Sequence, residues 1–441
     1  MMTPLLLDSE ASAADQSRVA GSLARRGLRT GDRVALSLQG STTYLSVVLG
    51  ALRSGIVPVP LDPRLTVYER DRILADVDPA LVIEDQGELE ELTDGPVGHL
   101  APAPLARPMH MTSGTTGKPK GVWTGILAPA HAAALVAEER QLWGFRASDV
   151  NLVISPIYHS APLRFAMGTL LAGGSVAVME HFDAAEFATA VGLVHPTTMF
   201  CVPAHLQRLF AWLDESGQDF DASSFRLVAH AGAPCPEPTR LRAHDLFGVD
   251  AVWEFYGSTE GQFTACPATA WQSHRGTLGR ARPGRVMSAD DDGLLWCEVP
   301  PHGRFQYWRD PEKTAAAWRG PTFTVGDLGR VEDGYVYLDA RREDLIISGG
   351  VNVYPAEVES ALADAVGLSD LAVFARADDR WGQKVCAAYV GEVSVEALKS
   401  LAEERLSPPK RPKEYVQVKE LPRTATGKVR RQDLADRAPR N

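Results

Sequence analysis

Apolar residues follow two alternating patterns in the N-terminal part of the chain: short continuous runs, and longer stretches with a period of about 3.6 residues. Turn-forming glycines at Gly27, Gly31 and Gly55 lie between these segments. The pattern predicts helices at Gln16–Arg25, Tyr44–Leu52 and Val67–Val77, and extended segments at Val34–Leu38, Ile56–Leu61 and Ala80–Ile83. Such alternation is typical of a mostly parallel sheet with helices on its faces.

The same alternation resumes in the middle of the chain, after a loose, proline-bearing segment at residues 86–108. Strands are predicted at Leu152–Ser155, Ser175–Met179, Thr197–Val202, Leu227–His230 and Val252–Tyr256. The clearest helix between them is Ala204–Asp214, which places Leu206, Leu209 and Phe210 on one face. A second doubly wound region is therefore expected, and ligands of such sheets bind beyond the carboxyl ends of the strands.

After Gly257 the strands become shorter and turns more frequent, which predicts a small β-rich lobe. A separate α+β unit is expected from about Arg341 onward. Its predicted elements are helices at Ala356–Ala363 and Val395–Glu404, and strands near Leu371–Phe374 and Cys386–Val390. The expected fold class is therefore α/β, with a large N-terminal domain of doubly wound sheets, a small β-rich lobe and a small C-terminal domain.

Composition narrows the possible functions. The 441 residues include 56 acidic and 45 basic side chains, and the net charge of −11 argues against a protein that mainly binds nucleic acid. The five cysteines include no Cys-x-x-Cys pair, which fits a reducing cytoplasm and indicates neither a zinc site nor a disulfide framework. Because no run approaches the ~18 apolar residues of a membrane span, we expect a soluble protein, and with the cysteine pattern a cytoplasmic one.

The segment Met111–Val122 crowds hydroxyl groups, glycines and lysines into a dozen positions. Glycines let backbone N–H groups approach an anion, hydroxyls add donors, and lysines add positive charge, so the segment predicts a phosphate-binding loop. Its candidate ligand residues are Thr112, Ser113, Gly114, Thr115, Thr116, Gly117, Lys118 and Lys120. It is not a Walker A loop, because Pro119 follows Lys118. The alternative is a flexible surface turn.

A second group of candidates follows a predicted strand directly: Tyr256, Gly257, Ser258, Thr259 and Glu260. The aromatic ring can stack on a purine and the glycine lets backbone approach a phosphate. The carboxylate can bind Mg²⁺, which often takes only one or two protein carboxylates. The alternative is a strand end with a buried tyrosine and a solvated glutamate.

Three weaker signals complete the set. The small residues Ala231, Gly232, Ala233 and Pro234 would let backbone lie against a flat ring, although a tight strand-to-helix turn would look alike. Asp327 can accept ribose hydroxyls, and Arg341, fourteen positions later, can reach a hydroxyl or phosphate; a plain turn is the alternative. Lys428 follows small residues near the end of the chain, where a solvated basic tail is the other interpretation.

Taken in order from roughly Thr43 to Lys428, these motifs resemble those of the adenylate-forming superfamily, which includes acyl-CoA synthetases, peptide-synthetase adenylation domains and luciferases. The resemblance implies that Tyr256 packs on adenine, Thr259 touches the α-phosphate and Glu260 binds magnesium. It implies that residues 231–234 lie against adenine and that Lys428 is the adenylation lysine. His159 matches a position near the incoming carboxylate, although a lone histidine is more often structural.

The resemblance also implies a domain organisation. Residues 1–340 are expected to form the adenylation domain with the ATP and acyl sites, 341–343 the hinge, and 344–441 a mobile C-terminal domain that carries the catalytic lysine. Glu343 takes the hinge position, where the family more often has Asp or Lys. Ser348, Gly349 and Gly350 begin the loop that meets the pantetheine arm. The opening strand pair of the family is missing, Trp123 departs from its usual pattern, and the lobe at 281–307 looks compressed.

The function implied by the resemblance is ATP- and Mg²⁺-dependent activation of a carboxylic acid to acyl-AMP, followed by transfer to the thiol of CoA. Phe165, Met167, Phe200 and Val202 are the candidate acyl-pocket residues and suggest an apolar acid. One alternative is a ligase that stops at acyl-AMP or transfers the acyl group to a carrier-protein pantetheine. Another is a luciferase-like or degenerate adenylate-binding member. The expected partners are these small molecules, with neither nucleic acid nor a membrane span, in a monomer or homodimer.

Overall fold

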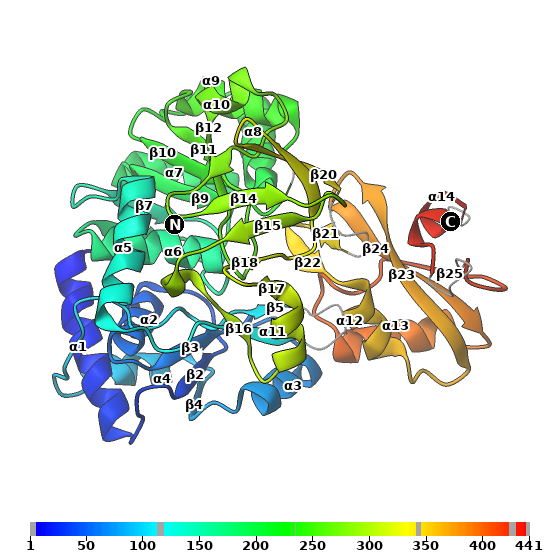
Figure 1. Cartoon of the computed structure of the whole chain (residues 1–441), viewed down its shortest axis with the longest axis horizontal. Coiled ribbons are helices and arrows are strands. Elements are labelled where there is room, and N and C mark those ends of the chain that lie inside the picture. Colours follow the sequence, from blue (N-terminus) through cyan, green and yellow to red (C-terminus); the bar gives the residue numbers. More distant parts are fainter. Residues whose placement is uncertain (1–5, 113–118, 234, 341–344, 423–428, 438–441) are drawn as a thin grey trace. The chain divides into compact units, whose positions relative to one another are not determined.

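A computed structural model of the chain describes residues 6–112, 119–233, 235–340, 345–422 and 429–437 (Figure 1). The chain divides into two units. The first comprises residues 1–63, 78–111 and 121–339, and the second comprises residues 64–77, 112–120 and 340–441. The predicted hinge at 341–343 lies outside the described residues, so the domain boundaries remain a prediction.

The first unit is built on a ten-stranded sheet with the order β1-β8-β7-β9-β10-β11-β12-β13-β20-β19. Its five central strands run parallel to one another. They are β7 (Val150–Val153), β8 (Ser175–Val178), β9 (Thr198–Cys201), β10 (Leu227–His230) and β11 (Val252–Glu254). Helices α6 (Ser160–Leu171), α7 (Ala184–Val194), α8 (Pro203–Ser216) and α9 (Glu237–Phe247) connect them. This arrangement confirms the α/β class and the expected central strands.

Local sequence explains where these helices begin and end. The carboxylate of Asp183 caps α7 by accepting from two backbone N–H groups of its first turn. Helix α8 begins with Pro203 and ends before Gly217, whose φ of 62° suits a glycine. The buried residues Leu206, Leu209 and Phe210 form the apolar face of α8, as predicted, and join the core beneath the sheet.

A smaller parallel sheet precedes the main one in sequence. It consists of β2 (Arg33–Leu36) between β3 (Val57–Pro60) and β4 (Leu81–Ile83). Helix α2 (Thr42–Arg53) begins at its cap, Ser41, and buries every residue from 44 to 52. Helix α1 (Ser9–Arg25) starts earlier than the apolar pattern predicted, because Asp8 caps a first turn made largely of polar residues.

The region after Gly257 is only partly a separate lobe. Strands β14 (Val286–Ala289), β15 (Leu295–Glu298), β17 (Trp318–Arg319) and β18 (Thr322–Phe323) form a sheet of their own. By contrast, β12 (Thr264–Pro267), β13 (Arg280–Ala281), β20 (Tyr335–Ala340) and β19 (Leu328–Glu332) extend the main sheet. The antiparallel pairing of β11 with β12 starts this extension.

The second unit contains a five-stranded sheet covered by helices. Its strands are β21 (Ile346–Ser348), β22 (Val351–Val353), β23 (Leu368–Asp378), β24 (Gly382–Gly391) and β25 (Glu414–Gln417). The helices of this unit are α3 (Val67–Val77), α12 (Pro355–Leu362), α13 (Val395–Arg405) and α14 (Arg431–Arg437). The described residues of the chain include no helix long and apolar enough to cross a membrane.

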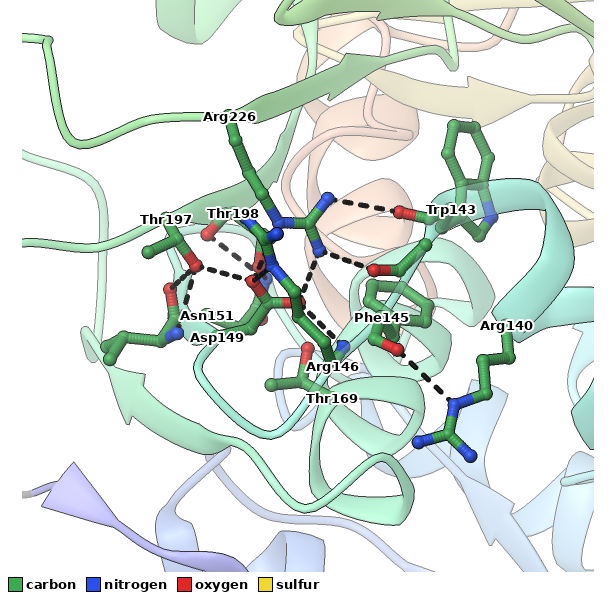
Figure 2. A network of polar contacts seen from close by, with 12 residues as sticks. Arg140, Trp143, Phe145, Arg146, Asp149, Asn151, Thr169, Thr197, Thr198 and Arg226 are labelled. Carbon is green, nitrogen blue, oxygen red and sulfur yellow. Dashed lines mark hydrogen bonds and ion pairs between the residues drawn. The ribbon is translucent and has the colours of Figure 1, made fainter.

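A partly buried polar network connects the amino ends of three central strands (Figure 2). Asp149, Thr197 and Arg226 stand immediately before β7, β9 and β10. The guanidinium of Arg226 binds both carboxylate oxygens of Asp149, and the hydroxyl of Thr197 donates to the same carboxylate over 3.0 Å. Burial alone would raise the pKa of Asp149, but the hydrogen bonds from Arg226 and from the Arg146 backbone outweigh it and lower that pKa. The network fixes the amino ends of these strands. Ligands of doubly wound sheets bind at the opposite, carboxyl ends of the strands.

Candidate functional site

Tyr256 and Asp327, from two separate motifs, meet in the first unit. The phenol of Tyr256 donates a hydrogen bond of 2.5 Å to Oδ2 of Asp327, across 71 positions of sequence. Tyr256 follows β11, and Asp327 precedes β19, where its carbonyl accepts from the backbone N–H of Leu295. Phe263 packs edge-on against the tyrosine ring at 4.8 Å between centroids. The aromatic candidate for adenine and the carboxylate candidate for ribose are therefore neighbours.

The turn that follows Tyr256 is held by its own hydrogen bonds. The backbone N–H of Ser258 donates to the carbonyl of Gly261 over 2.8 Å, and the Ser258 hydroxyl accepts from the N–H of Glu260 over 3.3 Å. A Cβ at Gly257 would lie 2.7 Å from that same Gly261 carbonyl oxygen, so the turn requires glycine there. These contacts present Thr259 and Glu260 on a fixed loop.

The carboxylate of Glu260 is buried and oriented. Its Oε1 accepts a 2.7 Å hydrogen bond from the phenol of Tyr307. Arg107 donates to the backbone carbonyls of Thr259 and Glu260 over 3.4 and 3.2 Å. In the described parts of the chain, no group of three or more His, Cys, Asp and Glu side chains could form a complete metal cage. A single oriented carboxylate still suits Mg²⁺, which takes its remaining ligands from water and substrate phosphates.

The loop at residues 231–233 leaves the carboxyl end of β10, next to the carboxyl end of β11 that precedes Tyr256. Gly232 adopts a φ of 87°, a conformation that favours glycine. At the strand end, burial lowers the pKa of His230 to about 4 despite the nearby Glu254 carboxylate. Because β10 and β11 are parallel neighbours, both predicted nucleotide loops lie at the same edge of the sheet.

His159 lies beyond the carboxyl end of β7 and occupies the N-cap position of helix α6. Its ring is exposed and packs on Tyr158 at 4.7 Å between ring centroids. The neighbouring His110 is buried, with Nδ1 at 3.2 Å from the Tyr158 carbonyl. Burial and the nearby Arg107 lower the pKa of His110 to about 3, so this ring is neutral at pH 7.

The remaining predicted residues fall into two groups. Thr112, Lys120 and the 348–350 loop belong to the second unit, where Lys120 Nζ lies 3.4 Å from Asp76 Oδ1 and Ser348 is fully buried. Gly349 and Gly350 have φ values of 58° and 81°. The residues that lie outside the described part of the chain are Ser113, Gly114, Thr115, Thr116, Gly117, Lys118, Pro234, Arg341, Glu343 and Lys428.

A cavity of about 1220 Å³, counting space open to solvent, adjoins the turn that carries Glu260. Helices α5 (Pro129–Trp143) and α6 supply much of its wall, and Ser258, Glu260 and Gln262 line it at the turn. Besides Glu260, the lining carries charged side chains that sequence reasoning missed: Arg107, Glu139, Arg140, Arg164, Arg282 and Arg285. The available signal was weak: Arg164 is a lone charge within an otherwise apolar helix.

The four residues expected to line the acyl pocket lie in different surroundings. Met167 lines this cavity, but Phe165, Phe200 and Val202 do not. Phe165 and Phe200 instead pack on each other and on Phe255 in an aromatic core cluster, which Val202 joins at its edge. Phe165 lies on the face of α6 that turns inward to the sheet, so it fills the core rather than a ligand site.

Comparisons with known proteins extend these observations. A family model described as AMP-binding enzyme matches residues 12–104 and 109–302, and one described as AMP-binding enzyme C-terminal domain matches 357–428. Indoleacetate–CoA ligase of Aromatoleum aromaticum is 30% identical over 477 residues, covering 95% of this chain and 90% of that protein. The fatty acid–(acyl-carrier-protein) ligase ScoC of Streptomyces coeruleorubidus is 30% identical over 473 residues, covering 96% and 90%.

Among solved structures, o-succinylbenzoate CoA synthetase of Bacillus subtilis aligns with a TM-score of 0.86 at 25% identity, covering 98% of this chain and 93% of that chain. The parallel sheet and the loops at the carboxyl ends of its strands define an α/β protein whose candidate site residues lie at the strand ends. The chain belongs to the AMP-binding enzyme family, because that family's model covers more than half of it.

Proposed function

We propose that the protein is an AMP-forming acid–thiol ligase that makes acyl-AMP from ATP and a carboxylic acid and then an acyl-CoA. The observation that carries this proposal is the hydrogen bond between Tyr256 and Asp327 beside the Glu260 turn. It brings together two motifs of the first unit, one with the adenine and phosphate candidates and one with the ribose candidate. Membership of the AMP-binding enzyme family and the similarity to several CoA ligases support it.

In the first step a carboxylate oxygen of the acid attacks the α-phosphorus of ATP, and pyrophosphate leaves as the bond to the β-phosphate breaks. Two anions approach each other in this step, so the enzyme must stabilise negative charge in the transition state more than in the bound reactants. We assign Lys428, Lys118 and Lys120 to this role. We assign Thr259 to the α-phosphate, and Glu260, held by Tyr307, would hold Mg²⁺, which would shield the phosphate charge.

In the second step the pantetheine thiol loses its proton and attacks the acyl carbon, and AMP leaves. We assign Ser348, Gly349 and Gly350 to the loop that meets the pantetheine arm and Glu343 to the hinge. The positive φ values of both glycines give this loop a backbone that L-residues with side chains rarely adopt. A carrier-protein pantetheine is the second candidate acceptor, since one relative is a fatty acid–(acyl-carrier-protein) ligase.

One incubation tests the proposal: purified protein with ATP, Mg²⁺, CoA and a panel of carboxylic acids. Release of AMP with formation of a thioester is the expected result. Pyrophosphate release without CoA consumption would favour an enzyme that stops at the adenylate or uses a carrier protein. No pyrophosphate with any acid, in a preparation that binds AMP, would contradict the proposed activity.

A further inference from the structure

The cavity beside the Glu260 turn carries an excess of positive charge. Five arginines line it, namely Arg107, Arg140, Arg164, Arg282 and Arg285. Two glutamates, Glu139 and Glu260, also line it. Glu138 is not part of the lining but forms ion pairs with Arg282 and Arg285. Arg140 is exposed, so its charge is solvated, and the other four arginines against Glu138, Glu139 and Glu260 leave a net charge of about +1 beside the cavity. Uncompensated charge of this kind is costly to bury unless an anion pairs with it.

The ion pairs inside the cluster do not use all its donors. Arg282 has a 4% exposed side chain, and its Nη1 donates to Glu139 Oε1 over 2.8 Å. Its Nε and Nη2 have no hydrogen-bond partner, although Nη2 lies 3.7 Å from Glu138 Oε2. Arg164 likewise leaves Nε and Nη2 without hydrogen bonds, with Nε at 3.4 Å from Glu139 Oε2. These nitrogens of both arginines are buried, so a ligand reaches them only when the side chains turn toward the cavity. Nε and Nη2 lie along one edge of a guanidinium, the edge that fits both oxygens of a carboxylate.

Glu138 and Glu139 do not supply hydrogen-bond acceptors for all of these guanidinium donors. Glu138 Oε2 and Glu139 Oε2 also lack hydrogen bonds, so the existing pairs are held by charge more than by geometry. Glu138 is shared further with the ring of His302. Burial, followed by the nearby Arg164 and Arg285, lowers the pKa of Arg107 to about 10, which agrees with an excess of cations.

The rest of the wall is apolar and includes Leu135, Val136, Met167, Leu171 and Phe323. At one end the cavity reaches Ser258 and Glu260 of the turn assigned to the phosphates. A ligand that fills it therefore needs an apolar body, a carboxylate at the turn and a second anionic group for the arginines. We propose that the acid activated by this protein carries a second carboxylate, or a comparable anion, which Arg164 and Arg282 bind. This inference rests on the proposed function.

A matched pair of substrates tests the inference. Straight-chain dicarboxylic acids are compared with their monomethyl esters, which keep the length and one reactive carboxylate but lack the second charge. Because a charge-assisted hydrogen bond is among the stronger polar contacts, we expect kcat/KM for pyrophosphate release to be about tenfold or more higher for the diacid. Arg164→Met should reduce this preference about tenfold, mainly through KM, and Arg164→Lys should restore part of it.

Arg242→Met is the control, because Arg242 forms its ion pair with Asp214 at an exposed site outside the cavity, and it should keep the wild-type preference. Equal use of diacid and monoester by the wild type would overturn the inference and leave the ligase activity standing. So would a preference that survives in folded Arg164→Met. Should Arg164→Met fail to fold, the wild-type comparison decides alone. Absence of pyrophosphate with every acid would instead refute the proposed function.

Discussion

The phenol of Tyr307 donates to the carboxylate of Glu260 over 2.7 Å, and both side chains are buried. Tyr307 ends β16 (Gln306–Tyr307), which pairs with β6 (Lys120–Trp123) through Val122, the last residue of the segment predicted to bind phosphate. The carboxylate assigned to magnesium is therefore oriented by a strand that packs beside the C-terminal end of that segment. A carboxylate held in this way loses little freedom when it binds a cation.

Replacing Glu260 with Gln should raise the Mg²⁺ concentration needed for half-maximal pyrophosphate release by about tenfold or more, because the neutral amide is a weaker ligand for a hard cation. The amide can still accept the hydrogen bond from Tyr307, so the melting temperature should change little. A magnesium titration of initial rates measures the effect. Glu312→Gln, at an exposed glutamate of α11 (Pro311–Ala317), is the matched control. An unchanged titration in Glu260→Gln would exclude the assignment.

Tyr256→Phe should weaken ATP binding more than turnover. It removes the hydrogen bond to Asp327 while keeping the ring, so the carboxylate assigned to ribose loses its positioning donor. Hydrogen bonds to charged groups contribute about 1.5–3 kcal/mol, which corresponds to a rise in KM for ATP of roughly tenfold or more. Steady-state kinetics of pyrophosphate release at saturating acid measures it. Tyr335→Phe is the control, and equal KM values for both variants would argue against the assignment.

Lys428→Ala should abolish most acyl-adenylate formation. If this amine acts only in the transition state, its loss costs on the order of 3 kcal/mol, and turnover falls about a hundredfold while ATP affinity stays nearly constant. Supplying synthetic acyl-AMP bypasses the first step, so thioester formation from it should persist. Lys399→Ala, at an exposed position of α13, controls for charge. Near-normal pyrophosphate release by Lys428→Ala would contradict the role.

The sequence predicted the parallel sheet well because strands that are buried on both faces have nearly continuous apolar sequences, such as Leu-Val-Ala in β10. The same reasoning placed Tyr256 and the 231–233 loop at strand ends, and the structure puts both loops at one edge. The roles of these residues remain predictions. Their expected positions depended on strand order, which alternating strands and helices constrain strongly.

The cavity could not be predicted from the sequence, since its arginines come from distant segments with no common spacing. Arg107 lies in a proline-bearing connection, Arg164 in a helix and Arg282 in a turn after β13. Each alone looks like an ordinary solvated charge. The antiparallel extension of the main sheet by β19 and β20 was missed for a similar reason, because strand pairing across a long connection leaves no local signal.

The polar network at the amino edge of the sheet gives a stability prediction. Arg226→Met should leave the carboxylate of Asp149 buried without its main partner, because that side chain has no exposed surface. Breaking one side of a buried ion pair costs about 3–5 kcal/mol, and the partial exposure of Arg226 places the expected loss near the lower value. Thermal unfolding at pH 7 measures it. Arg242→Met, which breaks an exposed pair, should cost less than about 1 kcal/mol.

The stability difference between wild type and Arg226→Met should depend on pH in a defined direction. The pKa of Asp149 in the folded protein lies below its ordinary value of 3.8. The stabilisation by its ionised form is therefore complete above about pH 4 and is lost as the pH falls through the folded pKa. Without Arg226 the buried carboxylate should protonate at higher pH, and its protonation removes the free-energy cost of burying an unpaired charge in the variant. Melting temperatures of the two proteins should therefore differ most near pH 7 and converge below pH 4, whereas a constant difference across this range would show that Arg226 stabilises the sheet by packing alone.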